Sequence, residues 1–120
     1  MKLMVCGSRT ITDKDWIFKQ IEDYIKELKA EDLVIIQGLA KGVDIIAKEW
    51  AENHNIKTLD FPAEWDKYGK SAGFKRNVTM VDECDCCLIL WDGVSLGTKH
   101  DITLCKSKNK PHKIVSYSTK

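Results

Sequence analysis

Short, mostly apolar segments alternate along the chain with longer stretches in which apolar residues recur every three or four positions. The short segments predict five strands, at 2–6, 33–36, 56–61, 86–91 and 113–117. The clearest is 86–91, CCLILW, whose side chains are apolar at every position, as in a strand that helices cover on both faces. The longer stretches predict four helices, which begin near residues 13, 43, 72 and 97.

This alternation is typical of right-handed βαβ units. We therefore expect one Rossmann-like domain over residues 1–120, with three α/β/α layers and a mostly parallel, five-stranded sheet. Thr12 or Asp13 is the candidate N-cap of the first helix. Pro62 should end the third strand, and the polar segment 62–71 that it opens is a long connection of the kind that is often functional.

Composition sets the broad class of the protein. The 120 residues are 43% hydrophobic and 31% charged with a net charge of +1, which is ordinary for a globular domain and gives no overall attraction to nucleic acid or a membrane surface. No signal peptide or membrane span is evident, so we expect a cytoplasmic protein. The five cysteines lack framework spacing and are expected to be reduced, buried residues; neither a metal nor a cofactor is expected.

Glycine and charged residues gather after the strands and not before them. GSRT (7–10), GLAKGVD (38–44), PAEW (62–65) and WDGVSLGT (91–98) follow the first four strands. The carboxyl ends of parallel strands share one edge, and open α/β sheets bind ligands there, where the strand order reverses. The sequence therefore predicts a ligand cleft at this edge.

These segments suit an anionic ligand. Gly93, Gly97 and Thr98 stand at the start of a predicted helix, whose free amides favour a phosphate. Arg9 and Arg76 could neutralise its charge. The alternative is that the glycines only make tight turns. The candidate ligand-binding residues are Gly7, Ser8, Arg9, Gly38, Ala40, Gly42, Asp44, Trp65, Arg76, Asn77, Asp92, Gly93, Ser95, Gly97 and Thr98, with Asp44 and Asp92 toward a ribose and Trp65 toward a base.

Taken in order, GSR, GLAKGVDIIAKEWA, FPAEW, AGFKRNVTM and WDGVSLGTKHD resemble the YspA/YpsA-related branch of the SLOG superfamily, over almost the whole chain. That superfamily joins the Smf/DprA DNA-processing proteins to the LOG (Lonely Guy) phosphoribohydrolases. The resemblance implies a Rossmann-like fold that binds nucleotide-derived ligands, with NAD or ADP-ribose derivatives among the proposals, and it implies a homodimer.

The resemblance leaves three functions open. The first is a module that binds a small nucleotide-derived ligand as sensor, carrier or sequestering protein. The second is a LOG-like nucleotide N-glycosidase, in which KRNVTM places Arg76 and GTKHD places Asp101 as catalytic residues; aspartate is one methylene shorter than the family's glutamate, and Asp92-Gly93 replaces its Pro-Gly-Gly. The third is DprA-like binding of single-stranded DNA, against which the net charge of +1 argues without removing it.

Overall fold

The fold is built on one twisted sheet. A computed structural model describes residues 1–118 and contains five strands: β1 (Lys2–Gly7), β2 (Val34–Gln37), β3 (Lys57–Asp60), β4 (Cys86–Trp91) and β5 (His112–Ser116). Their order is β3-β2-β1-β4-β5, and every pairing between neighbours is parallel. The predicted fold class is confirmed, and each strand end lies within a residue or so of the expected position.

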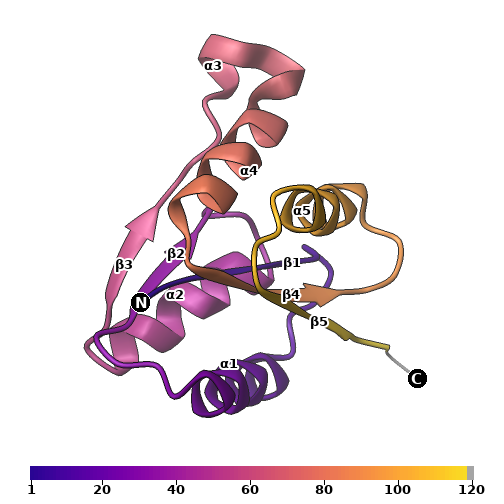
Figure 1. The fold of residues 1–120 in the computed structure, drawn as a ribbon. Helices are drawn as coiled ribbons and strands as arrows, with labels where there is room; N and C mark the ends of the chain where they lie inside the picture. The colour runs from indigo at the N-terminus through magenta and orange to yellow at the C-terminus, as the bar shows by residue number, and fades with distance from the viewer. Residues whose placement is uncertain (119–120) are drawn as a thin grey trace.

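Helices cover both faces of the sheet (Figure 1). On one face, α1 (Lys14–Leu28) and α2 (Val43–Asn53) pack on side chains such as Leu3 and Val5. On the other, α4 (Ala72–Glu83) and α5 (Leu96–Ser107) pack on Met4 and Cys6. Alternate residues of β1 therefore enter opposite cores, as the pleat of a strand requires. Within residues 1–118, no helix has the length and apolar character needed to cross a bilayer.

The cysteines are buried free thiols. Cys86 and Cys87 belong to opposite cores, because neighbouring residues of a strand point to opposite faces. At the start of α1, the amide of Trp16 donates to Asp13 Oδ1 at 3.2 Å, so Asp13 and not Thr12 is the N-cap.

The segment 62–71 differs from the expectation. It contains α3 (Trp65–Tyr68) and the 3-10 helix η1 (Gly69–Ser71), which lead directly into α4 and project away from the sheet (Figure 1). A four-residue helix is too short to show a periodic apolar pattern, and its residues are all exposed. Sequence periodicity therefore has no means of finding it.

The strand order places a switch point beside β1. The chain runs outward from β1 through β2 to β3, and then returns to lay β4 on the other side of β1. Crossovers from β1 and β4 leave toward opposite faces, so the carboxyl ends of these two strands open a crevice between them. Gly7–Thr10 and Asp92–Thr98 line its two sides.

Candidate functional site

A cavity of about 420 Å³ lies at this switch point. It collects residues from the loops after β1, β2 and β4, together with the inner faces of α4 and α5. Of the sequence-predicted residues, the following line it: Gly7, Arg9, Ala40, Asp44, Arg76, Asn77, Asp92, Ser95, Gly97, Thr98 and Asp101. Segments that are far apart in the sequence are thus brought to one place.

The other sequence-predicted residues lie beside the cavity without lining it. Ser8 is fully buried beneath it, and its Oγ accepts the Asp92 amide hydrogen at 3.0 Å, which ties the β1 loop to the β4 loop. Gly38 and Gly42 belong to the walls behind it, and Gly93 lies in the exposed turn after β4. Trp65 lies on α3, half exposed, in a neighbouring pocket.

Most of the glycines in these loops serve packing. A Cβ on Gly7 would lie 2.3 Å from the Leu90 carbonyl oxygen, and one on Gly38 would lie 2.5 Å from Arg76 Nη1. Gly42, with φ of 80°, brings its loop against the backbone of Arg9. At these three positions the turn-forming explanation of the glycines is sufficient.

Gly97 is different. It is exposed in the first turn of α5, and among the described residues no atom lies within 4 Å of the position of a Cβ there. The amides of Leu96, Gly97 and Thr98 precede the first helical hydrogen bond, from the Lys99 amide to the Ser95 carbonyl at 3.1 Å. Such first-turn amides have no acceptor within their own helix and carry its positive end. This turn is therefore an open receptor for an anion.

Asp92 has a structural role. Its Oδ1 accepts the amide hydrogens of Val94 at 2.9 Å and Ser95 at 2.8 Å, and its Oδ2 accepts from the Thr10 hydroxyl at 2.7 Å. These bonds, that of Val94 first, lower the pKa of Asp92 to about 2. Oδ1 therefore holds the β4–α5 loop in shape and Oδ2 ties it to the loop after β1, while the role of Asp92 toward a ribose stays a prediction.

Two other carboxyl groups lie at the inner end of the cavity. Asp44, on α2, is 4% exposed and accepts the Gly38 amide hydrogen at 2.8 Å. Asp101, on α5, is 5% exposed, and within residues 1–118 its Oδ1 is buried with no hydrogen-bond partner. Burial raises the pKa of Asp44 to about 6 and that of Asp101 to about 7. The Asp44 carboxylate also raises the pKa of Asp101.

Arg76 provides the positive charge near this pair. Its guanidinium lowers the pKa of both Asp44 and Asp101, though by less than burial raises them. Nη1 donates to the Gly38 carbonyl oxygen at 2.6 Å and Nε donates to Asn77 Oδ1 at 3.0 Å. The buried Asn77 thus orients Arg76, while Arg9 remains exposed at the cavity rim.

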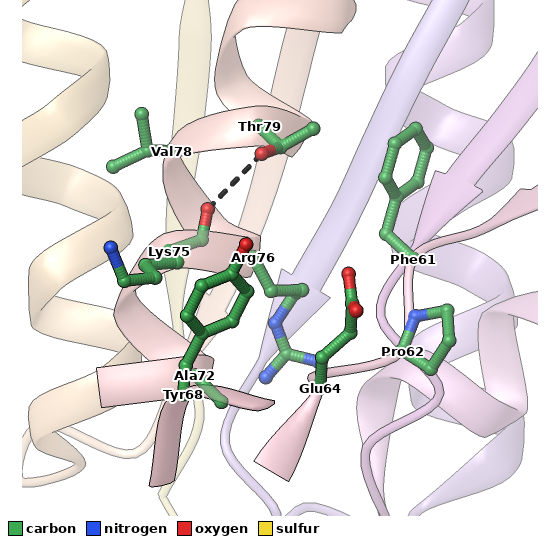
Figure 2. Close-up of a pocket in the computed structure, with 9 residues that line it drawn as sticks. All are labelled: Phe61, Pro62, Glu64, Tyr68, Ala72, Lys75, Arg76, Val78 and Thr79. Atoms are coloured by element: carbon green, nitrogen blue, oxygen red, sulfur yellow. Dashed lines mark hydrogen bonds between the residues drawn. The ribbon is translucent and has the colours of Figure 1, made fainter. Parts of the chain in front are cut away.

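Two further hollows border the same arginine. A pocket of about 180 Å³ lies between the half-exposed rings of Trp65 and Phe74 and shares Arg9 and Arg76 with the main cavity. A cavity of about 520 Å³ lies on the far side of Arg76, between the end of β3 and α4, with Glu64 and Tyr68 at its mouth (Figure 2). Although larger, it is not lined by a buried carboxylate, so we place the candidate site in the smaller cavity.

Some lining residues are missed by sequence reasoning. Cys6 and Met80 form part of the wall and are buried, and Thr10 and Val94 stand on the rim. Cys6 and Met80 occupy apolar core positions of a strand and a helix, so no sequence signal separates them from the rest of the core. Thr10 follows the GSR motif directly and could have been included with it. Trp91, which could have stacked on a base, instead packs in the α4–α5 core and donates to the Ser95 carbonyl oxygen at 3.1 Å.

Comparison with solved structures supports the fold. The chain is similar to DNA processing protein A (DprA) from Streptococcus pneumoniae, with a TM-score of 0.77 and 22% identity, covering 98% of this chain and 50% of that one. It is also similar to DprA from Helicobacter pylori, described for its single-stranded DNA binding mode, with a TM-score of 0.70 and 23% identity, covering 98% of this chain and 66% of that one. The chain thus spans half to two-thirds of the length of these structures.

Comparison of sequences identifies the family. The chain is 33% identical over 105 residues to the Gene 61 protein of Mycobacterium phage D29, covering 82% of this chain and 83% of that one. The model of the YspA, cpYpsA-related SLOG family (YAcAr) matches residues 1–68, which hold the β1 and β2 loops of the cavity. The chain therefore belongs to the YspA, cpYpsA-related SLOG family.

Proposed function

We propose that this protein binds a small nucleotide-derived ligand in the 420 Å³ cavity, as sensor, carrier or sequestering module. The observation that carries the proposal is Asp101 Oδ1, a buried oxygen without a partner among the described residues. It belongs to a residue that lines the cavity, which the start of α5 also lines. Buried polar atoms are hydrogen-bonded in most folded proteins, so an exception at a cavity needs an explanation. A bound ligand supplies one.

The parts of a nucleotide match the parts of the cavity. A phosphate suits the first turn of α5, where Gly97 leaves room and Arg9 adds positive charge. The sugar suits the inner end beside Asp44 and Asp101, and the base suits the pocket between Trp65 and Phe74. NAD and ADP-ribose derivatives contain the same three parts and fall in the same ligand class.

Isothermal titration calorimetry with nucleoside monophosphates, NAD and ADP-ribose tests the proposal. We expect at least one of them to bind, and we expect Arg9→Ala to weaken that binding by about tenfold because a charge-assisted contact to phosphate is lost. Lys26→Ala, on the exposed side of α1, is the matched control and should bind like the wild type. Binding by none of these compounds, or binding that Arg9→Ala leaves intact, would reject the proposal.

A nucleotide N-glycosidase is the second candidate, and one observation favours it. Asp101 has a pKa of about 7 and lies near the Arg76 guanidinium, and a carboxyl group with such a pKa suits acid–base work at neutral pH. The test is incubation with nucleoside 5′-monophosphates, followed by chromatography for free base. Release of base that Asp101→Ala abolishes would establish turnover, whereas binding without release would leave a binding module.

Single-stranded DNA is a third candidate, which the H. pylori DprA comparison brings to this chain. The supporting observation is the exposed surface of α3 and α4, where Trp65, Tyr68 and Phe74 lie among lysines. Aromatic and basic side chains of this kind stack on bases and contact phosphates. The expected signature is a gel-shift affinity that falls steeply with salt. Absence of a shift at low salt would remove this candidate.

A further inference from the structure

The inference concerns the sugar of the ligand and rests on the proposed function. Three carboxylates line the cavity, but their free acceptor capacity differs. Asp92 accepts from Thr10, Val94 and Ser95 through its two oxygens. Asp44 accepts from the Gly38 amide through Oδ2. Within residues 1–118, Asp101 Oδ1 accepts from no group.

The ionised Asp101 carboxylate can only accept hydrogen bonds, so the missing partner of its Oδ1 is a donor. A phosphate or carboxylate has no donor when ionised and would be repelled by the carboxylates of Asp44 and Asp101. An apolar group would leave the oxygen unpaired, and a buried unpaired acceptor is costly. A hydroxyl or an N–H of the ligand satisfies it.

The position of Asp101 selects the hydroxyl. It follows Thr98 by three residues, which is about 4.5 Å along the axis of α5, and its side chain leans back toward the helix start. A phosphate on the first turn of α5 therefore brings the adjoining sugar, and not the more distant base, to the Asp101 carboxylate. The base then fits the pocket lined by Trp65 and Phe74, which shares Arg9 and Gly97 with the main cavity.

Asp44 provides a second carboxylate acceptor in the same cavity. Asp44 comes from α2, on the opposite face of the sheet from α5, and lines the same cavity close enough to affect the ionisation of Asp101. Two carboxyl groups that line one cavity can accept from two neighbouring hydroxyls, one for each. We propose that Asp44 and Asp101 bind the vicinal diol of a ribose, with Asp101 accepting from the 2′-hydroxyl and Asp44 from the 3′-hydroxyl, so that the site selects ribonucleotides over 2′-deoxyribonucleotides.

Calorimetry with paired probes tests this selection. The probes are the four ribonucleoside 5′-monophosphates and their 2′-deoxy counterparts, each titrated separately into the full chain. A hydroxyl bonded to a carboxylate contributes enough that we expect the ribo form to bind about 10–100-fold more tightly than its deoxy partner. Asp101→Ala should reduce that ratio to about one, mainly by weakening the ribo form.

Two further variants make the result interpretable. Asp101→Asn keeps the side-chain volume, so it provides a folded protein if the alanine variant does not fold, and it too should lower the ratio. Arg9→Ala removes a rim charge near the phosphate, so it should weaken both sugar forms equally and leave the ratio unchanged. Circular dichroism confirms folding in each case.

The outcomes separate the two proposals. Ribo and deoxy forms that bind equally well would overturn the diol inference and leave nucleotide binding in place. A preference for ribose that survives in both Asp101 variants would also overturn it, because another group would then be the acceptor. Failure of every nucleotide to bind would overturn the proposed function, and the inference with it.

Discussion

At the scale of single residues, Asp101 is the feature that folding does not explain. A buried carboxyl group without a full set of hydrogen bonds destabilises a fold, and this one also lies near a second carboxyl group, Asp44. The nearby Cys6 thiol lowers the pKa of Asp101, but it is a weak donor and leaves Oδ1 without a partner among the described residues. A residue that costs stability where a ligand could bind is the pattern expected of a functional site.

This cost predicts that Asp101→Asn stabilises the protein at pH 8. The folded-state pKa of Asp101 is raised to about 7 from an ordinary 3.8, so its contribution to stability is largest below pH 4 and is lost as the pH rises through 7. Asparagine does not ionise, so we expect a gain of about 1–3 kcal/mol at pH 8 that disappears toward pH 4. Urea unfolding at several pH values measures it.

Asp92→Asn is the matched control, because its pKa is shifted the other way, to about 2. Its contribution is present above the ordinary pKa and lost as the pH falls toward 2. This variant should lose about 0.5–2 kcal/mol at neutral pH, as when other capping carboxylates are removed. An Asp101→Asn protein that is less stable than the wild type at pH 8 would contradict the account.

The sequence predicted the residues of the site only where a charged or polar side chain was unusual for its position. Arg76, Asp44 and Asp101 stand out as charges within the motifs, and all three line the cavity. Asp92 stood out equally, yet its oxygens hold a loop, because sequence does not tell which backbone amides a carboxylate will meet. Cys6 gave no signal, because a residue of a buried strand is apolar whether it lines the cavity or only packs in the core.

At the scale of elements, the start of α5 carries the anion-binding hypothesis. Gly97 is the position at which a side chain can be introduced with little disturbance, because its Cβ would meet no atom of the described chain within 4 Å. The backbone of the first turn then stays in place while the local charge changes. The element can be tested without rebuilding the fold.

Gly97→Glu and Gly97→Gln form a matched pair. Both side chains fill similar space, but the glutamate carboxylate would occupy the positive end of α5 and repel a phosphate. We expect Gly97→Glu to weaken nucleotide binding at least tenfold more than Gly97→Gln does, with similar thermal stability. Calorimetry on both variants measures this difference, and equal affinities would place the phosphate elsewhere.

Helices and strands were predictable where their burial in the fold gives the sequence a regular pattern of apolar residues. The strand at Cys86–Trp91 is apolar throughout because helices cover both of its faces, and α1 repeats its apolar residues because one side packs on the sheet. The exposed α3, Trp65–Tyr68, packs too little to leave such a pattern. Short exposed helices of this kind depend on their neighbours and not on periodicity.

At the scale of the whole molecule, the strand order β3-β2-β1-β4-β5 creates the crevice. The alternation of strands and helices was enough to predict a ligand cleft at the carboxyl edge of the sheet, without the order of the strands. The strand order does not determine whether another surface covers the rim of the cavity. Trp65, Phe74, Val94 and Leu96 are half to mostly exposed apolar side chains of the α3–α4 segment and the β4–α5 loop. Exposed apolar side chains favour contact with another surface.

We accordingly predict a homodimer in solution. Light scattering on the eluate of a sizing column should give about twice the chain mass of 13.7 kDa. Replacing Val94 and Leu96 together by serine should shift the mass toward one chain, because these two side chains are the most exposed of the group. A mass of 13.7 kDa for the wild type at micromolar concentration would contradict this prediction.

Backbone amide NMR shifts during a titration measure directly where a nucleotide binds. With the tightest-binding ribonucleotide, we predict the largest shifts at Gly97, Thr98, Asp101 and Asp44, which line the 420 Å³ cavity. Small shifts there, with the main changes instead at Phe61, Tyr68 and Thr79 around the larger cavity, would contradict the account.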